Sequence, residues 1–254
     1  MRSIYPVLER LALQGLNVQG VAAADDRAEE LLPGCRCMVV VGSGGRALWE
    51  DFQAALREDP RRLTGQDQPL EAHVQRIIEQ ADPSPVSRRW LYASDPGVPM
   101  QELALKAGLG VRGRLWLIMH PEFGPWMALR AVCLTTEELP VTGPSAEPGP
   151  CVGCPAPCVS ACPGSALSVG ELDWDRCVAQ QAVHGRCAPH CHSRRACPEG
   201  LQHAYGELQQ RYHADPRSGR PLLATRLGIT GDRRAPEGPF ADVLRSFRKE
   251  TRDD

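Results

Sequence analysis

Cysteine is the residue type in this sequence with the clearest chemistry, because its thiolate is a soft ligand for iron, zinc and copper. The 254-residue chain has 11 cysteines. Eight of them fall in one short segment: Cys151, Cys154, Cys158, Cys162, Cys177, Cys187, Cys191 and Cys197. In a small secreted protein such density indicates disulfides, but in a chain of this length without a signal peptide it more often indicates metal. We therefore predict a metal-binding module.

The spacing of these cysteines favours two four-iron clusters. Ferredoxin-type modules use three closely spaced cysteines and then a Cys-Pro, whose thiolate binds the other cluster. A run of cysteines ends in Cys-Pro here at Cys162 and at Cys197, although three residues rather than the usual two separate the second cysteine from the third. The pattern assigns the eight thiolates to quartet 1 (Cys151, Cys154, Cys158 and Cys197) and quartet 2 (Cys162, Cys177, Cys187 and Cys191).

Structural zinc is the main alternative for this segment. The pair Cys151 and Cys154 could join Cys187 and Cys191 around one tetrahedral ion. Three histidines lie close by in the sequence: His184, His190 and His192. The two Cys-Pro endings favour iron because zinc does not require them, and a module without metal is the remaining alternative. Three further cysteines lie in or beside apolar runs and are predicted to be buried thiols: Cys35, Cys37 and Cys133.

Residues 1–139 are predicted to form the scaffold that positions this module. Apolar residues recur at helical spacing in residues 3–16, 47–56, 69–80 and 100–107. Apolar runs bounded by turn residues predict strands at residues 37–42 and 90–93, and a hairpin that pairs residues 114–119 with residues 126–134. Alternating helices and strands favour an α+β or α/β layer structure.

The rest of the chain divides at residues rich in proline and glycine. A linker, residues 140–150, leads to the cysteine module at residues 150–199. Residues 200–254 are predicted to form a helix, at residues 201–213, and then a flexible tail with a short helix near residues 240–248. Few apolar residues in this tail could offset the entropy of ordering it.

Composition limits the classes of function. The formal net charge is −2, which gives no general argument for binding nucleic acid or membranes. No apolar run approaches the roughly 20 residues of a spanning helix. We therefore expect a cytoplasmic protein that does not bind membranes.

Several groups of residues along the chain resemble two known families. Ala-Gly-Leu-Gly at residues 107–110, His-Pro-Glu-Phe-Gly-Pro-Trp at residues 120–126 and the cysteine-rich segment after them resemble the epoxyqueuosine reductases. Residues 38–48, 120–130 and 205–212 are similar to the cobalamin-processing CblC family. The resemblance implies a nitroreductase-like α+β scaffold with a ferredoxin-like module, carrying cobalamin and two [4Fe–4S] clusters.

The resemblance also implies roles for single residues. The cofactor-binding residues would be His120, Phe123, Gly124, Trp126 and Arg130. Gly124 would let the backbone approach a flat ligand. Arg130 lies within a predicted strand, where its charge needs either an anionic ligand group or a salt bridge. Asp95 would be the catalytic proton donor, one position out of register with the family pattern.

The function implied is that of a cobalamin- and iron–sulfur-dependent oxidoreductase. Its reaction would be reductive cobalamin processing or reduction of an organic substrate, with electrons from a ferredoxin or flavodoxin. Nucleic acid would be a partner only if the substrate is a tRNA base. A non-catalytic cobalamin chaperone, a ferredoxin-type electron carrier and a flavin-dependent oxidoreductase on the same scaffold remain as alternatives. Bound flavin instead of a corrin would distinguish the last of these.

Overall fold

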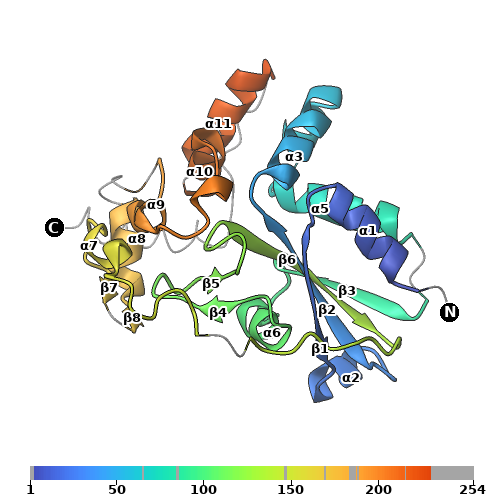
Figure 1. The fold of residues 1–254 in the computed structure, drawn as a ribbon. Coiled ribbons are helices and arrows are strands. Elements are labelled where there is room, and N and C mark those ends of the chain that lie inside the picture. Colours follow the sequence, from blue (N-terminus) through green and yellow to red (C-terminus); the bar gives the residue numbers. More distant parts are fainter. Residues whose placement is uncertain are drawn as a thin grey trace, which may run out of the picture.

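The computed structural model describes residues 3–64, 66–83, 86–145, 148–168, 170–182, 187, 189–214 and 216–229. Its centre is a four-stranded antiparallel sheet (Figure 1). The strands follow the order β1 (Val18–Ala23), β2 (Cys37–Gly44), β6 (Met127–Thr135) and β3 (Arg88–Tyr92). Every residue of β2 is buried, which agrees with the apolar run that predicted a strand there. The α+β class is therefore confirmed.

Helices cover both faces of the sheet (Figure 1). Successive strand residues point to opposite faces, so β2 and β6 supply two cores. The first core packs against α1 (Tyr5–Leu13), α3 (Ala47–Glu58), α4 (Arg61–Thr64) and α5 (Pro69–Ala81). The second core, built on Met38, Val40, Val132 and Leu134, packs against α2 (Asp26–Leu31) and α6 (Met100–Lys106).

The predicted hairpin of residues 114–119 with 126–134 is wrong. Residues 113–117 form a tight turn in which Trp116 has a φ of 58°, and only β4 (Val111–Arg112) and β5 (Ile118–Met119) pair across it. Strand β6 pairs instead with β2 and β3, which are distant in sequence. The apolar run indicated β propensity but not the partner, because strand pairing depends on contacts elsewhere in the chain.

The chain after the cysteine module also differs from the prediction. The helix expected at residues 201–213 is divided into a 3-10 turn, η1 (Leu201–His203), and α10 (Glu207–Ala214). A further helix, α11 (Pro216–Leu227), occupies a region predicted to have little to pack, because Leu223 and Ala224 reach the first core. The predicted tail beyond Ile229, including residues 240–248, lies outside the described residues.

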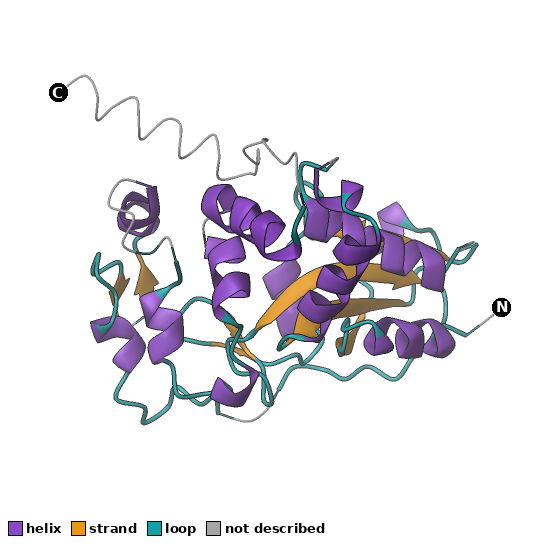
Figure 2. Cartoon of the chain, turned by 90° about the horizontal axis from the view of Figure 1, so that it is seen from above, coloured by secondary structure: helices purple, strands orange, loops and turns teal. Residues whose placement is uncertain are grey.

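The cysteine-rich segment forms short elements beside the end of the sheet where β4 and β5 lie (Figure 1). These elements are α7 (Pro157–Ser160), β7 (Leu167–Ser168), β8 (Glu171–Leu172), α8 (Trp174–Ala182) and α9 (His192–Ala196). Figure 2 shows from above that these short elements lie to one side of the central sheet. A small third core joins this segment to the scaffold, through Leu115 and Met119 on one side and Cys158, Leu167 and Cys197 on the other.

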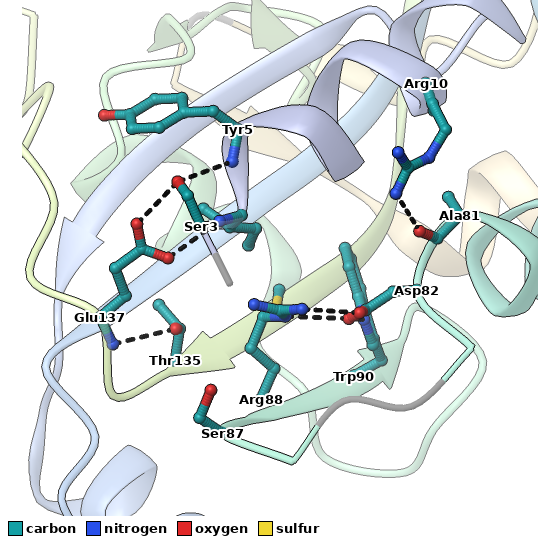
Figure 3. A network of polar contacts seen from close by, with 12 residues as sticks. Ser3, Tyr5, Arg10, Ala81, Asp82, Ser87, Arg88, Trp90, Thr135 and Glu137 are labelled. Carbon is teal, nitrogen blue, oxygen red and sulfur yellow. Dashed lines mark hydrogen bonds and ion pairs between the residues drawn. The ribbon is translucent and has the colours of Figure 1, made fainter. Parts of the chain in front are cut away.

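Edge strand β3 is held by a buried ion pair (Figure 3). The Asp82 carboxylate accepts hydrogen bonds from Arg88 Nη2 at 2.7 Å, Arg88 Nε at 3.0 Å and Trp90 Nε1 at 3.0 Å. Burial alone would raise the pKa of Asp82, but these hydrogen bonds and the charge of Arg88 outweigh it and lower that pKa. Within the described residues, no helix has the length and apolar character needed to cross a membrane.

Candidate functional site

The four cysteines of quartet 1 line one small cavity. Cys151 and Cys154 precede α7, Cys158 lies in it, and Cys197 caps the end of α9. Arg114 reaches this loop from the scaffold, donating from Nη1 to the Cys154 carbonyl at 3.1 Å. Burial raises the pKa of Cys158 and of Cys197, and neighbouring thiols of the same quartet raise both further.

Quartet 2 lines a second, larger cavity of about 290 Å³. Cys162 follows α7, Cys177 lies in α8, and Cys187 and Cys191 precede α9. Burial raises the pKa of Cys177 and Cys187, the latter to about 11, and in both cases Cys191 and Cys162 add to the effect. We call this space the junction cavity, because residues outside the cysteine module form its other wall: Leu115, Trp116, Leu117 and Trp126 from the scaffold, and Tyr205 and His213 from the chain after the module.

The two cavities bear on the choice between iron and zinc. The zinc alternative joins Cys151 and Cys154 to Cys187 and Cys191, but these two pairs line different cavities. His190 and His192 stack on each other, with ring centroids 4.6 Å apart, and His184 lies outside the described residues. Within the described residues no three His, Cys, Asp or Glu side chains are arranged to hold a single ion, and this applies to the thiols of both quartets as well as to the zinc set. Each quartet gives its own cavity four thiols, the number of donors that an iron–sulfur cluster takes, and the assignment to clusters stays a prediction.

Arg194 fastens the cysteine module to the scaffold. It lies on α9, and its guanidinium sits 4.9 Å from the Trp126 ring centroid and 4.5 Å from that of Tyr205. Its Nε donates to the Pro125 carbonyl at 3.0 Å, and Nη2 donates to the same oxygen and to the Met127 carbonyl. One side chain from between the last two cysteines thus orders the aromatic wall of the junction cavity.

Of the five predicted cofactor residues, Trp126 lines the junction cavity. It is fully buried and meets Tyr205 edge to face, with centroids 5.5 Å apart. The indole Nε1 of Trp126 and the imidazole Nε2 of His213 have no hydrogen-bond partner within the described residues. Burial, together with the charges of Arg130 and Arg194, lowers the pKa of His213 to about 3, so this imidazole is neutral near pH 7.

His120, Phe123 and Gly124 form a closed turn that does not line the junction cavity. His120 Nδ1 accepts hydrogen bonds from the amides of Glu122 and Phe123, and burial lowers the pKa of His120. Gly124 has a φ of 53°, and a Cβ there would lie 2.7 Å from the Glu199 carbonyl. The space beside this glycine is therefore filled by the chain that follows quartet 1.

Arg130 already has a carboxylate partner. It lies on the central strand β6, is buried, and donates from Nε to Ser43 Oγ at 3.1 Å. Its Nη1 lies 3.1 Å from Glu71 Oε1. Because this ion pair satisfies the charge, Arg130 needs no anionic ligand to be stable in this position.

Asp95 lies away from the junction cavity. Its Oδ2 accepts a hydrogen bond from the Tyr92 amide at 2.8 Å, as expected of turn geometry. It lines a separate cavity on the face of the sheet that carries α2 and α6, and that cavity shares no lining residue with the junction cavity. The structure therefore does not bring Asp95 together with Trp126 and quartet 2.

This combination of antiparallel sheet, flanking helices and appended cysteine segment defines a fold shared with several solved structures. An epoxyqueuosine reductase from Streptococcus thermophilus matches with a TM-score of 0.55 at 14% identity, over 89% of this chain and 80% of that one. A C. elegans B12-trafficking protein, CblC, matches with a TM-score of 0.53 at 12% identity, over 89% of this chain and 96% of that one. A catabolic reductive dehalogenase matches with a TM-score of 0.51 at 16% identity, over 85% of this chain and 35% of that one.

Sequence comparison gives the particular relatives. The chain is 36% identical over 110 residues to an epoxyqueuosine reductase of Gloeobacter violaceus, which is 39% of this chain and 33% of that protein. It is 28% identical over 160 residues to the Listeria monocytogenes epoxyqueuosine reductase, which is 58% of this chain and 40% of that protein. The chain thus spans a third to two fifths of these curated relatives. No protein-family model matches it. The predicted resemblance to epoxyqueuosine reductases is confirmed, and the fold is shared with CblC and a reductive dehalogenase.

Proposed function

We propose that this protein is an iron–sulfur, cobalamin-dependent reductase of the epoxyqueuosine reductase type. The observation that carries the proposal is that each predicted quartet lines its own cavity, and that the aromatic wall of the scaffold faces quartet 2 across the junction cavity. Such a cavity, mostly apolar with a few polar groups, is typical of a cofactor or substrate site. Sequence similarity to epoxyqueuosine reductases supports an oxidoreductase.

The chain's own residues would hold the cofactors. The two quartets would each bind one [4Fe–4S] cluster, and burial, which raises the pKa of Cys158 and of Cys187, favours the protonated form of these two thiols until iron displaces the proton. Clusters and corrin, when bound, would supply electron transfer at low potential. Trp126 and Tyr205 would pack against the corrin, and Arg194 would hold these two rings in position opposite quartet 2.

For the substrate we propose epoxyqueuosine carried in a tRNA; the names of the curated relatives support the epoxyqueuosine part of this proposal. The protein would then act in the cytoplasm, where tRNA is modified, and a ferredoxin or flavodoxin would be the electron donor. Asp95 would reach such a substrate only if the loop that carries it moves from the Tyr92 amide. Reductive cobalamin processing is the second candidate, favoured by the match to nearly the whole length of the CblC protein.

Three measurements on anaerobically purified protein test the proposal. Iron and acid-labile sulfide should be present at about eight atoms each per chain. A cobalamin titration should give saturable binding, whereas a yellow bound chromophore would indicate the flavin alternative. Loss of epoxyqueuosine from a modified tRNA stem-loop, followed by mass spectrometry, separates the first candidate from cobalamin processing. Stoichiometric zinc without iron would overturn the proposal. Binding of cobalamin without conversion of either epoxyqueuosine or cobalamin would favour a chaperone.

A further inference from the structure

A third cavity, of about 300 Å³, lies on the face of the sheet that carries α2 and α6. Its floor is made by buried residues of two central strands, Met38, Val132 and Leu134. The two helices on this face, α2 and α6, are short, with six and seven residues, and both contribute residues to the lining of the cavity. Leu91 and Leu103 form the walls. The body of any ligand here would therefore be apolar.

The mouth of this cavity carries two exposed arginines, Arg27 and Arg89. Arg89 Nη1 donates to the Leu31 carbonyl at 2.9 Å, which places this guanidinium at the end of α2. Arg27 lies one helical turn before Leu31, and its Nη2 would be 3.3 Å from a Cβ built on Gly97. Within the described residues neither arginine has an ion-pair partner.

The two carboxylates at the mouth are already engaged. Asp25 caps α2 through the Ala28 amide at 3.1 Å and pairs with Lys106 at 3.0 Å. Asp95 accepts from the Tyr92 amide at 2.8 Å. Among the charged residues that line the cavity, Asp25 is offset by Lys106, so the two arginines outnumber the one remaining carboxylate, Asp95, and this lining favours an anion.

We propose that this cavity binds a small organic carboxylate with an apolar body. The apolar end would rest on Met38, Val132 and Leu134, and the carboxylate would meet the guanidinium groups of Arg27 and Arg89, whose planar donors match its two oxygens. The site is separate from the junction cavity, since the two share no lining residue. Ligand binding at this site can therefore be tested independently of the proposed reductase activity.

Calorimetric titration of the anaerobically purified full chain with octanoate tests the proposal, with the uncharged octanamide as the comparison ligand. Octanoate should bind saturably and about tenfold more tightly than octanamide, the factor expected from two partly exposed charge contacts. The double variant R27Q/R89Q should lose this preference, whereas R57Q should keep it, because Arg57 is exposed on α3 on the other face of the sheet. Iron content should be the same in all three proteins.

A cavity-filling variant adds a second readout. Leu103→Phe should weaken both ligands by narrowing the cavity, provided that circular dichroism shows a native spectrum. If that variant does not fold, the surface arginine variants still decide the question. The proposal is overturned if octanoate does not bind saturably, if octanamide binds equally well, or if R27Q/R89Q retains the preference for the carboxylate.

Discussion

Replacing Arg194 by methionine should loosen the cysteine module from the scaffold without removing a cluster ligand. The guanidinium makes cation–π contacts with Trp126 and Tyr205 and donates to the Pro125 carbonyl. Each cation–π contact contributes about 0.5–2 kcal/mol, and a hydrogen bond from a charged donor about 1.5–3 kcal/mol. Since one guanidinium makes all of these contacts, their contributions are not additive. We expect Arg194→Met to lower the free energy that holds the cysteine module on the scaffold by about 2–4 kcal/mol.

Hydrogen exchange and the rate of cobalamin reduction measure this loss. Amides of the segment containing Pro125 and Met127 should exchange faster in Arg194→Met, and electrons should reach cobalamin more slowly at unchanged iron content. Arg195→Met is the matched control, because the neighbouring Arg195 is exposed and contacts only His190 among the interactions of the described residues. Arg194→Lys should fall between wild type and Arg194→Met, because lysine keeps the charge but not the planar donor geometry.

The same result for Arg194→Met and Arg195→Met would refute this reasoning. The junction would then be held by the third core and by the chain connections alone. A loss of iron in Arg194→Met would also count against it, because Arg194 is placed here as a positioning residue and not as part of either quartet.

Three further predictions concern a cysteine of quartet 1, the buried ion pair of Asp82 and Arg88, and His213. Cys154→Ala should contain about half the wild-type iron, whereas Cys35→Ala, which changes a buried thiol of the second core, should keep it all on metal analysis. Asp82→Asn should lower the free energy of unfolding by about 3–5 kcal/mol in urea titrations, because it removes the negative charge from the buried ion pair with Arg88. The lowered pKa of His213 has no effect on stability above pH 6.5, because the imidazole is then neutral in both the folded and the unfolded chain, and it costs about 1.4 kcal/mol per pH unit below pH 6.5. His213→Phe should therefore unfold with a flatter pH dependence between pH 6.5 and 5, and an unchanged slope would contradict the burial argument.

Helices with a clear apolar face could be predicted from the sequence, but strand partners could not. Residues 69–80 repeat their apolar positions at helical spacing, and α5 forms there. Residues 114–119 are equally apolar, yet they turn at Trp116, and β6 pairs with strands far away in the chain. Helical periodicity is a local property, whereas strand register depends on which segments meet in the folded core.

The cysteine quartets could likewise be predicted from local sequence spacing, whereas the residues of the proposed cofactor pocket could not. The Cys-Pro rule divides the thiols into quartets without any knowledge of the fold, and the quartets line two cavities. Arg194 carried no such signal, because its role arises from two aromatic rings that lie far from it in sequence. Gly124 was interpreted as a site of ligand approach, but the chain itself fills that space. Asp95 followed a family motif, and the fold places it on another face.

The most direct test of the central claim is a rapid-mixing experiment with reduced protein and aquocobalamin under anaerobic conditions. Absorbance of the iron–sulfur clusters and of the corrin would be followed together. If quartets 1 and 2 hold clusters that feed a corrin across the junction cavity, the clusters should be oxidised at the rate at which the corrin is reduced. The account is contradicted if the corrin is reduced no faster than in a protein-free mixture, or if the clusters stay reduced while cobalamin is bound.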